Sequence, residues 1–226
     1  MRLPRWFIKL GFYLLYNHMA FTYDTVAWLV SFGQWSAWRR LALRYVQPGP
    51  ILELAYGTGG LFVDMSSTTG LQPVGIDISP YMARLASRRL KEQGLPAPLC
   101  RAKAQNIPFP DGHFANIIAT FPTNYIFEPE TLAEIHRLLQ TDPPGRMIVV
   151  IEGQLRGPWP IRPFIDWLYR VTDQRDFPPR QTLPIFGEYD LTANWHVAEE
   201  NGALARLLII EKRSHDDNLL NPSSFS

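Results

Sequence analysis

Apolar residues in the middle of the chain follow two patterns that alternate along the sequence. Five short, almost uninterrupted apolar runs are typical of strands that are buried on both faces of a sheet. These runs cover residues 51–55, 74–77, 99–102, 115–120 and 145–151. The segments that begin near Gly60, Ser79 and Glu130 repeat apolar residues every three to four positions, which predicts helices. Strands that alternate with helices predict a parallel sheet with right-handed connections.

The C-terminal part of the chain changes this pattern. Residues 191–199 and 203–212 predict two strands, and the Asn-Gly pair between them is a strong hairpin signal. The predicted fold class is therefore α/β, with a Rossmann-like, mostly parallel seven-stranded sheet that ends in an antiparallel C-terminal hairpin. Before the hairpin we expect a helix over residues 161–172 and a proline-rich loop over residues 176–188 that could fold over a pocket.

The first forty-six residues have a different character. Residues 10–23 and 25–38 contain no acidic or strongly basic side chain, but each run is shorter than the roughly 20 residues that span a membrane. Asn17, His18 and the bulky aromatics argue against a signal peptide, so we expect two or three helices. The predicted domains are an N-terminal helical cap over residues 1–46, an α/β ligand-binding domain over residues 47–213 and a disordered tail over residues 214–226.

A glycine-rich turn follows the first predicted strand. Residues 57–60 read Gly-Thr-Gly-Gly and stand directly before the next predicted helix. Strand, glycine turn and helix form the nucleotide-binding order of an open α/β sheet, because glycine lets the backbone approach a ligand and the helix offers free N–H groups. A dinucleotide fingerprint would need a third glycine where Phe62 stands, and there is no Gly-Lys-Ser/Thr phosphate loop. An ordinary tight connection is the alternative interpretation.

The second predicted strand ends in an acid. Asp77 lies twenty positions after Gly57, where a carboxylate can accept hydrogen bonds from both ribose hydroxyls of an adenosine. Such an acid could instead cap the following helix, but Ser79 and Pro80 already supply the N-cap and first-turn signals. Asp77 is therefore a candidate nucleoside-binding residue.

Together with Glu53, these features resemble the first motifs of the class I S-adenosylmethionine (SAM)-dependent methyltransferases. Residues 104–114, Ala-Gln-Asn-Ile-Pro-Phe-Pro-Asp-Gly-His-Phe, are similar to the A-x-x-L-P-F-x-D-x-x-F-D passage of the ubiquinone/menaquinone-biosynthesis members. Residues 23–27 and 31–39 resemble the Y-D-x-x-A…S-x-G-x-x-x-x-W-R entry segment of the same enzymes. The resemblance runs, with gaps, from about residue 23 to residue 150.

Three positions depart from the family pattern. Lys103 stands where the family usually has an aspartate that meets the adenine amino group, so adenine recognition would rest on Ala104 and Gln105. Tyr56 replaces the usual Cys or Gly before the motif glycine, and Ala-Asn at residues 115–116 replaces the closing aspartate. These departures concern individual cofactor contacts more than the fold.

The resemblance implies SAM as cofactor and a small, hydrophobic acceptor such as a quinone precursor. The implied cofactor-binding residues are Glu53, Ala55, Tyr56, Gly57, Thr58, Gly59, Asp77, Ile78, Ala104, Gln105 and Thr120. The implied substrate-binding residues are Tyr23, Gln34, Phe121, Asn124 and Tyr125. No residue stands out as a general base, which suits a reaction in which the protein chiefly aligns acceptor, methyl group and sulfur and excludes water. A tyrosine such as Tyr56 or Tyr23 beside the sulfonium would add a cation–π interaction.

Composition narrows the range of partners. The net charge of +1 over 226 residues argues against nucleic acid, and the single cysteine excludes an internal disulfide and fits a reducing, cytoplasmic setting. Without a second cysteine or a histidine cluster we expect no metal site. Arg2, Arg5 and Lys9 stand among aromatics such as Trp6, a composition that settles at lipid headgroups and predicts peripheral contact with the inner face of the membrane. Packing of these aromatics into the protein's own core is the alternative.

Two other functions remain compatible with the sequence. A nicotinamide-dependent oxidoreductase would share the strand, the glycine turn and the acid, although the third glycine is missing. A catalytically silent protein of the SAM-binding fold, acting as a partner or assembly factor, is compatible with Lys103 in place of the adenine-binding acid. Binding of SAM rather than NAD(P) would exclude the oxidoreductase.

Overall fold

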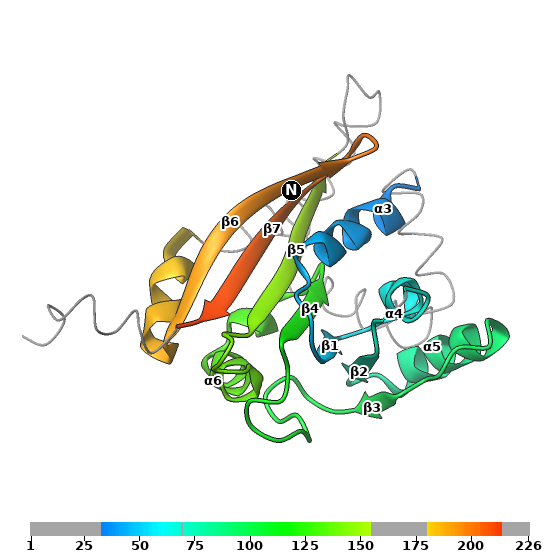
Figure 1. Cartoon of the computed structure of the whole chain (residues 1–226), viewed down its shortest axis with the longest axis horizontal. Helices are drawn as coiled ribbons and strands as arrows, with labels where there is room; N and C mark the ends of the chain where they lie inside the picture. The colour runs from blue at the N-terminus through cyan, green and yellow to red at the C-terminus, as the bar shows by residue number, and fades with distance from the viewer. Residues whose placement is uncertain (1–32, 69, 155–179, 214–226) are drawn as a thin grey trace, which may run out of the picture.

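Seven strands form one twisted sheet with helices on both faces (Figure 1). The computed structural model describes residues 33–68, 70–154 and 180–213. The strands are β1 (Ile51–Leu54), β2 (Pro73–Asp77), β3 (Leu99–Arg101), β4 (Asn116–Thr120), β5 (Arg146–Gln154), β6 (Leu191–Glu200) and β7 (Ala203–Lys212). The α-helices are α3 (Trp35–Arg40), α4 (Gly60–Ser66), α5 (Pro80–Glu92) and α6 (Pro129–Leu138), and the 3-10 helices are η1 (Leu41–Tyr45), η2 (Asn124–Phe127) and η3 (Arg180–Tyr189).

The order of the strands across the sheet is β3-β2-β1-β4-β5-β7-β6. The first five strands pair in parallel, whereas β7 runs antiparallel to both β5 and β6. The predicted mostly parallel sheet with an antiparallel C-terminal hairpin is therefore confirmed. β1 and β4 are neighbours at the point where the chain changes direction across the sheet. Ligands of open α/β sheets bind outside the carboxyl ends of the strands at this point.

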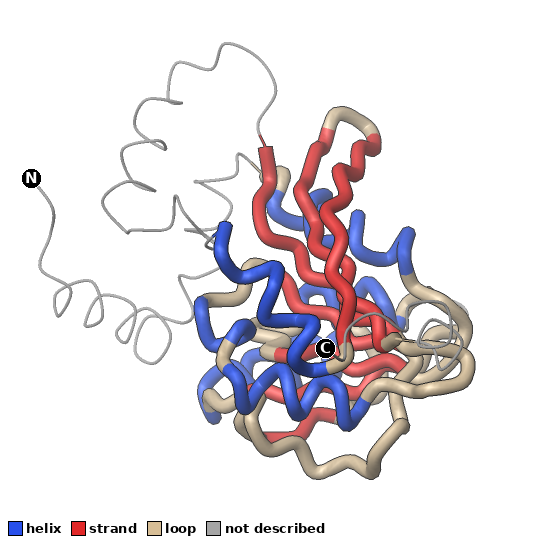
Figure 2. Tube along the Cα trace, turned by 90° about the vertical axis from the view of Figure 1, so that its left-hand side faces the viewer, coloured by secondary structure: helices blue, strands red, loops and turns tan. Residues whose placement is uncertain are grey.

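Each face of the sheet carries its own apolar core, because successive strand residues point to opposite faces. In β4, Ile117 and Ala119 pack on the α6 face, whereas Ile118 packs on the α4 face. On the α6 face the helix contributes Leu132, Ile135 and Leu138. On the α4 face the helices contribute Trp38, Leu41, Ala42, Leu61, Phe62, Met65 and Leu90. Figure 2 shows the helices flanking the strands and the β6–β7 hairpin extending beyond them.

Polar and close-packed contacts fix α3 over the sheet. The fully buried Asn116 of β4 exchanges two hydrogen bonds with the backbone of Gln47, at 2.9 and 2.8 Å. The Gln47 side chain donates to two further backbone carbonyls, one just before β4 and one just before β5, at 3.1 and 3.0 Å. At Gly153 of β5 the Trp38 indole occupies the space that a Cβ would take. The chain segment from α3 to residue 47 is therefore fastened to the same sheet that carries the glycine turn.

Arg137 of α6 holds the loop between β3 and β4. Its guanidinium donates to the carbonyls of Ile107 and Phe109 and pairs with Asp111 at 2.6 Å and with Glu134 at 2.8 Å. Glu134 also accepts a hydrogen bond from the Ile107 N–H at 2.6 Å. The Pro-Phe-x-Asp part of the family-like passage therefore anchors this loop to α6.

The structure corrects the prediction for the segment before the hairpin. From residue 180 to residue 189 the chain forms η3, where a loop folding over the pocket was expected. Phe186 is buried against Phe127, with 6.0 Å between ring centroids, so η3 packs on the α6 face and not over the glycine turn. The predicted helices before residue 33, the helix over residues 161–172 and the tail over residues 214–226 lie outside the described residues.

Candidate cofactor and acceptor site

The glycine turn, residues 55–60, connects the carboxyl end of β1 to α4. Ala55 has a φ of 58°, and its N–H donates to a carbonyl of β2 at 2.8 Å. At Gly59 a Cβ would lie 2.8 Å from the Cβ of Ala86 in α5, so the packing of α5 requires glycine there. At Gly57 no atom lies within 4 Å of the Cβ position. The turn therefore leaves space beside its backbone where a ligand can approach.

Asp77 organises both the glycine turn and the start of α5. Its Oδ2 accepts a hydrogen bond from Gly57 N at 2.9 Å, and its Oδ1 accepts one from Ser79 N at 2.8 Å. Burial raises the pKa of the carboxyl, while these backbone donors act in the opposite direction. Ser79 caps α5 as predicted, because its Oγ accepts from Met82 N. A carboxylate has about four acceptor positions, so Asp77 keeps capacity for ribose hydroxyls.

An apolar surface follows this acid. Ile78 is 57% exposed, and it is one of two large apolar side chains with this much exposure among the described residues. Residues 103–106 form a tight turn in which Ala104 is half-buried against the α6-face core. Gln105 donates from Nε2 to Glu128 at 2.7 Å, so its amide nitrogen is already engaged. Adenine recognition at this turn would therefore use backbone groups or the Gln105 oxygen.

Glu53 is buried in β1 at the base of the glycine turn. The residue is 2% exposed, and its Oε2 accepts no hydrogen bond from the described residues. Burial raises the pKa of this carboxyl from 4.5 to about 8, the Arg39 guanidinium opposes the shift, and the carboxylates of Asp77 and Asp64 reinforce it. Arg39 reaches down from α3 and donates from Nε and Nη2 to Asp64 of α4, both at 3.3 Å.

Tyr56 and Thr58 support the turn from inside. Burial, with the Asp77 carboxylate as a second cause, raises the pKa of the buried Tyr56 hydroxyl to about 12. The Tyr56 ring lies over β2, where a Cβ at Gly75 would come within 2.8 Å of it. Thr58 is buried and accepts a hydrogen bond from Arg89 of α5 at 3.1 Å.

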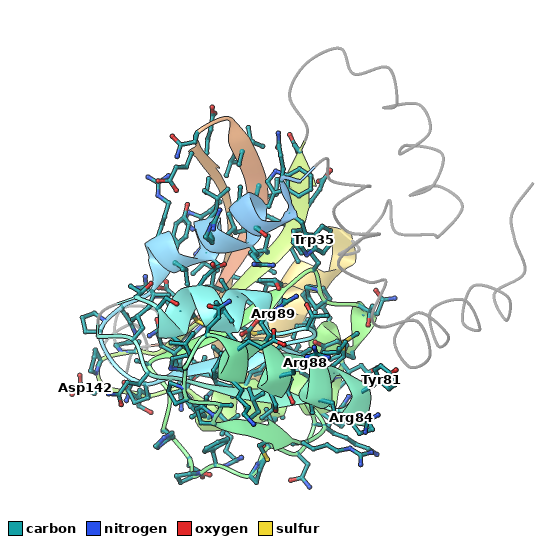
Figure 3. All side chains as sticks on the ribbon, turned by 90° about the vertical axis from the view of Figure 1, so that its right-hand side faces the viewer. Trp35, Tyr81, Arg84, Arg88, Arg89 and Asp142 are labelled. Atoms are coloured by element: carbon teal, nitrogen blue, oxygen red, sulfur yellow. The ribbon has the colours of Figure 1, made fainter. Side chains whose placement is uncertain are left out.

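Three aromatic rings meet at the carboxyl end of β4. Phe121 has a φ of 50°, and its N–H donates to a carbonyl of β5 at 2.8 Å. Its ring stacks on Trp35 of α3, with 4.0 Å between centroids and 30° between planes. Trp38 meets both rings edge-on at 6.5 Å. α3 therefore reaches the edge where the parallel strands end, and Figure 3 shows Trp35 apart from the basic side chains of α5.

The remaining predicted residues occupy different surroundings. Thr120 is the half-buried last residue of β4. Gln34 is the N-cap residue of α3, directly before Trp35, and its buried Oε1 accepts no hydrogen bond from the described residues. Asn124 is exposed at the start of η2, whereas Tyr125 is half-buried against the α6-face core. Tyr23 lies outside the described residues.

Two residues of this edge were not among the predicted site residues. Arg39 and Trp35 come from α3, which crosses above β5 and contacts α4. Both stand in the segment that resembles the family's entry segment, and its closing Trp-Arg pair was the available signal. Sequence pattern could not show that Arg39 acts on Glu53, because the two positions are distant along the chain.

Comparison with known proteins identifies the family to which the chain belongs. Residues 51–142 match the family model of a methyltransferase domain. A demethylmenaquinone methyltransferase of Thermus thermophilus is 34% identical over 169 residues, which cover 73% of this chain and 74% of that protein. The chain belongs to the class I SAM-dependent methyltransferases. The chain is an enzyme that resembles the ubiquinone/menaquinone-biosynthesis methyltransferases, and SAM is its cofactor.

Further comparisons agree with this assignment. The methyltransferase is 31% identical over 144 residues to the ubiquinone/menaquinone biosynthesis C-methyltransferase UbiE of Geotalea uraniireducens, covering 60% of each chain. A geranyl diphosphate methyltransferase in complex with SAM has a TM-score of 0.59 and 18% identity, covering 79% of this chain and 85% of that one. The cyclase SpnF has a TM-score of 0.58 and 16% identity, covering 79% and 81%. These two structures show the shared fold, and the sequence relatives favour methyl transfer over the oxidoreductase and silent-partner alternatives.

Proposed function

We propose that this methyltransferase transfers the SAM methyl group to a small hydrophobic acceptor of the quinone-precursor type. The observation that carries the proposal is the stacked Trp35–Phe121 pair, with 4.0 Å between ring centroids, at the carboxyl end of β4. Flat apolar surfaces suit an acceptor ring. Two relatives carry the names of quinone-biosynthesis methyltransferases, which supports the same acceptor class.

In this proposal the nucleoside half of SAM lies along the carboxyl ends of β1 and β2. Asp77 would accept hydrogen bonds from the ribose hydroxyls through the oxygens that also hold Gly57 and Ser79. Ile78, 57% exposed, would cover one face of the adenine. The open space beside Gly57 would let the ligand come close to the backbone of the glycine turn. The residues Glu53, Ala55, Tyr56, Thr58, Gly59, Ala104, Gln105 and Thr120 would complete the cofactor site.

The chain's role in the reaction is to align the acceptor and exclude water. Bound SAM would supply a methyl group that is already activated, because its sulfur is a positively charged sulfonium. Phe121 and Trp35 would hold the acceptor ring, and the buried Gln34 Oε1 would accept a hydrogen bond from an acceptor hydroxyl. Asn124 and Tyr125 of η2, with Tyr23, would line the remaining acceptor surface. Alignment of reacting groups is the main source of rate in such a transfer.

We place the enzyme in the cytoplasm, in peripheral contact with the inner face of the membrane through its N-terminus. A hydrophobic acceptor would be dissolved in lipid, so the enzyme would meet it at the surface. The first sixteen residues contain three basic and five aromatic side chains, which supports this contact. None of the described helices combines the length and the hydrophobicity that crossing a membrane requires.

Cofactor binding is the first test of this function. In calorimetry the full-length enzyme should bind SAM and S-adenosylhomocysteine. Asp77→Ala should weaken binding by about 1–3 kcal/mol, which is about 5- to 150-fold, because hydrogen bonds to a charged group are lost. Glu152→Ala removes an acid from the partly exposed pair between Glu152 of β5 and Arg206 of β7 and should leave binding unchanged. No SAM binding by the folded wild-type enzyme would contradict the proposed function.

Acceptor identity is tested with the same protein. Methyl-labelled SAM and a short-chain demethylated quinol should yield a product whose mass rises by one labelled methyl group. A water-soluble amine or carboxylate acceptor should give no product. Turnover of the soluble acceptors alone would contradict the hydrophobic acceptor class while leaving methyl transfer intact.

A further inference from the structure

The starting point is the state of Glu53 in the free protein. This carboxyl is buried in β1, two residues before the left-handed Ala55, and its Oε2 has no hydrogen-bond donor among the described residues. An ionised carboxylate that leaves water without a donor is strongly destabilised, so a buried acid of this kind usually keeps its proton. The sequence resemblance names this acid as a cofactor contact but says nothing of its protonation.

The charged groups around Glu53 come from three neighbouring elements. Among the described residues, Arg39 of α3 is the cation that acts on it, and Asp64 of α4 and Asp77 of β2 are acids. The Arg39 guanidinium lies against Gly60, in the space that a Cβ would occupy there. It spends its Nε and Nη2 donors on Asp64, at 3.3 Å. Arg40 approaches the other Asp64 oxygen at 3.7 Å.

Arg39 therefore donates hydrogen bonds to Asp64, whereas it acts on Glu53 only through its positive charge. In the part of the chain that the structure describes, the charged groups that act on Glu53 are two acids and the partly exposed Arg39, so the Glu53 carboxylate itself is short of positive charge. Tyr56 is the other titratable neighbour, and it stays neutral because burial and the Asp77 carboxylate raise the pKa of its hydroxyl to about 12. A further cation placed above the glycine turn would remove the shortage.

We propose that Glu53 holds a proton in the free enzyme and releases it when a cationic ligand group binds at the glycine turn, so that cofactor binding is coupled to proton release. The O–H bond of the carboxyl breaks, its electrons stay on the carboxylate, and the proton goes to the solvent. The inference rests on the proposed cofactor site, because SAM brings an α-ammonium and a sulfonium, whose positive charge its single α-carboxylate offsets only in part. Arg39 acts as a positioning residue, because its positive charge stabilises the ionised form of Glu53 that remains after the proton has left.

This coupling makes cofactor affinity depend on pH. Below pH 8, the free enzyme must lose a proton for the ligand to bind, so affinity should rise up to tenfold for each pH unit between 6 and 7.5. The α-ammonium of the ligand titrates near 7.7–8.0, so measurements should stay below that range. The rise in affinity should be absent in Glu53→Gln, which keeps the shape of the side chain but carries no proton to release.

Calorimetry on the full chain at pH 6.8 measures the released protons directly. The binding enthalpy is recorded in buffers of different ionisation enthalpy, and its slope gives protons per ligand. SAM should release about one proton from the wild-type enzyme. The matched ligand is 5′-methylthioadenosine, which shares the nucleoside but has no positive charge and should release none. The matched variant is Glu152→Gln, which should behave as wild type because Glu152 lies in the surface pair with Arg206.

Several outcomes decide the inference. SAM binding without proton release, or equal release with 5′-methylthioadenosine, would overturn it and leave the proposed function standing. Failure of wild-type protein to bind SAM at all would instead count against the proposed function. Should Glu53→Gln not fold, the wild-type comparison of the two ligands still decides. Arg39→Gln provides a second variant, in which SAM affinity should fall and proton release should persist to higher pH.

Discussion

Ala55 and Phe121 each follow the last residue of a parallel strand, and both have left-handed backbones, with φ of 58° and 50°. Side chains in this conformation cost about 1–2 kcal/mol each. β1 and β4 are adjacent, yet the Ala55 amide bonds outward to β2 and the Phe121 amide bonds outward to β5. The segments that follow β1 and β4 are therefore held apart beyond the carboxyl ends of these two strands. Strain of this kind gathers at functional sites, and here it opens the edge where the ligand is proposed to bind.

The protonated Glu53 should also be visible in the stability of the free enzyme. Its pKa is raised from 4.5 to about 8 by burial, so between these values the folded state holds a proton that the unfolded state has lost. The contribution of Glu53 to the free energy of unfolding is therefore fully present below pH 4.5. It falls by about 1.4 kcal/mol for each pH unit between pH 4.5 and pH 8. Urea unfolding of wild type and Glu53→Gln should show the variant gaining relative stability as pH rises. Parallel curves for the two proteins between pH 5.5 and 8 would contradict this.

Single residues were predictable from the sequence where one local rule decides them. Ser79 was assigned as an N-cap from its place before Pro80, and the structure confirms it. Asp77 was singled out from its spacing to the glycine turn, and its role on a ribose stays a prediction, while the structure shows that it accepts a hydrogen bond from Gly57 N. The approach of Arg39 to Glu53 could not be found in this way, because it depends on how α3 folds back over the sheet.

At the scale of elements, α3 joins the two halves of the candidate site. One end of the helix carries Arg39, beside α4 and the base of the glycine turn. The other end carries Trp35, stacked on Phe121 at the end of β4. Trp38 between them is buried against β5. A shift of this one helix would therefore disturb the cofactor end and the acceptor end together.

The acceptor end can be tested separately from the cofactor end. Trp35→Ala removes a stacked ring and should lower kcat/KM for the hydrophobic acceptor about tenfold, the effect of one aromatic contact. SAM affinity should stay within about twofold, because Trp35 lies at the end of α3 opposite Arg39. Trp35→Phe should restore part of the loss.

The control is Trp195→Ala, since Trp195 of β6 packs with the α6-face core under Arg206. It should leave acceptor kinetics unchanged in the folded enzyme. Equal losses of acceptor turnover and SAM affinity in Trp35→Ala would show that the ring serves α3 packing and not the acceptor.

Strands and the final hairpin were largely predictable, because uninterrupted apolar runs and an Asn-Gly turn are strong local signals. Five parallel strands and the hairpin appear where the pattern placed them. The segment before the hairpin was not predictable, because three prolines suggested a loop. Phe186 decides its place, since burial of this ring against Phe127 pulls residues 180–189 into η3. Tertiary burial overrode local composition there.

At the scale of the whole molecule, positive charge is found in two places that could meet a membrane. One is the N-terminal segment with Arg2, Arg5 and Lys9. The other is α5, where Arg84 and Arg88 are exposed (Figure 3). On α5, however, Arg84 lies over the Tyr81 ring at 4.9 Å and Arg88 pairs with Glu92 at 2.7 Å. Aromatic residues accompany the N-terminal charges, so we expect the N-terminal segment to be the membrane contact.

Sedimentation with vesicles separates these two surfaces. Full-length protein should bind vesicles containing anionic lipid, and the bound fraction should fall as salt is raised, because surface charges are screened. Each basic residue near an anionic surface contributes about 1 kcal/mol, so replacing Arg2, Arg5 and Lys9 with Gln should weaken binding by roughly a hundredfold. Removal of residues 1–16 should abolish it, whereas replacing Arg84 and Arg88 with Gln should not. If the α5 variant loses binding and the N-terminal variants keep it, the enzyme meets the membrane through α5. Protein that stays in the supernatant at low salt would instead favour an acceptor delivered from solution.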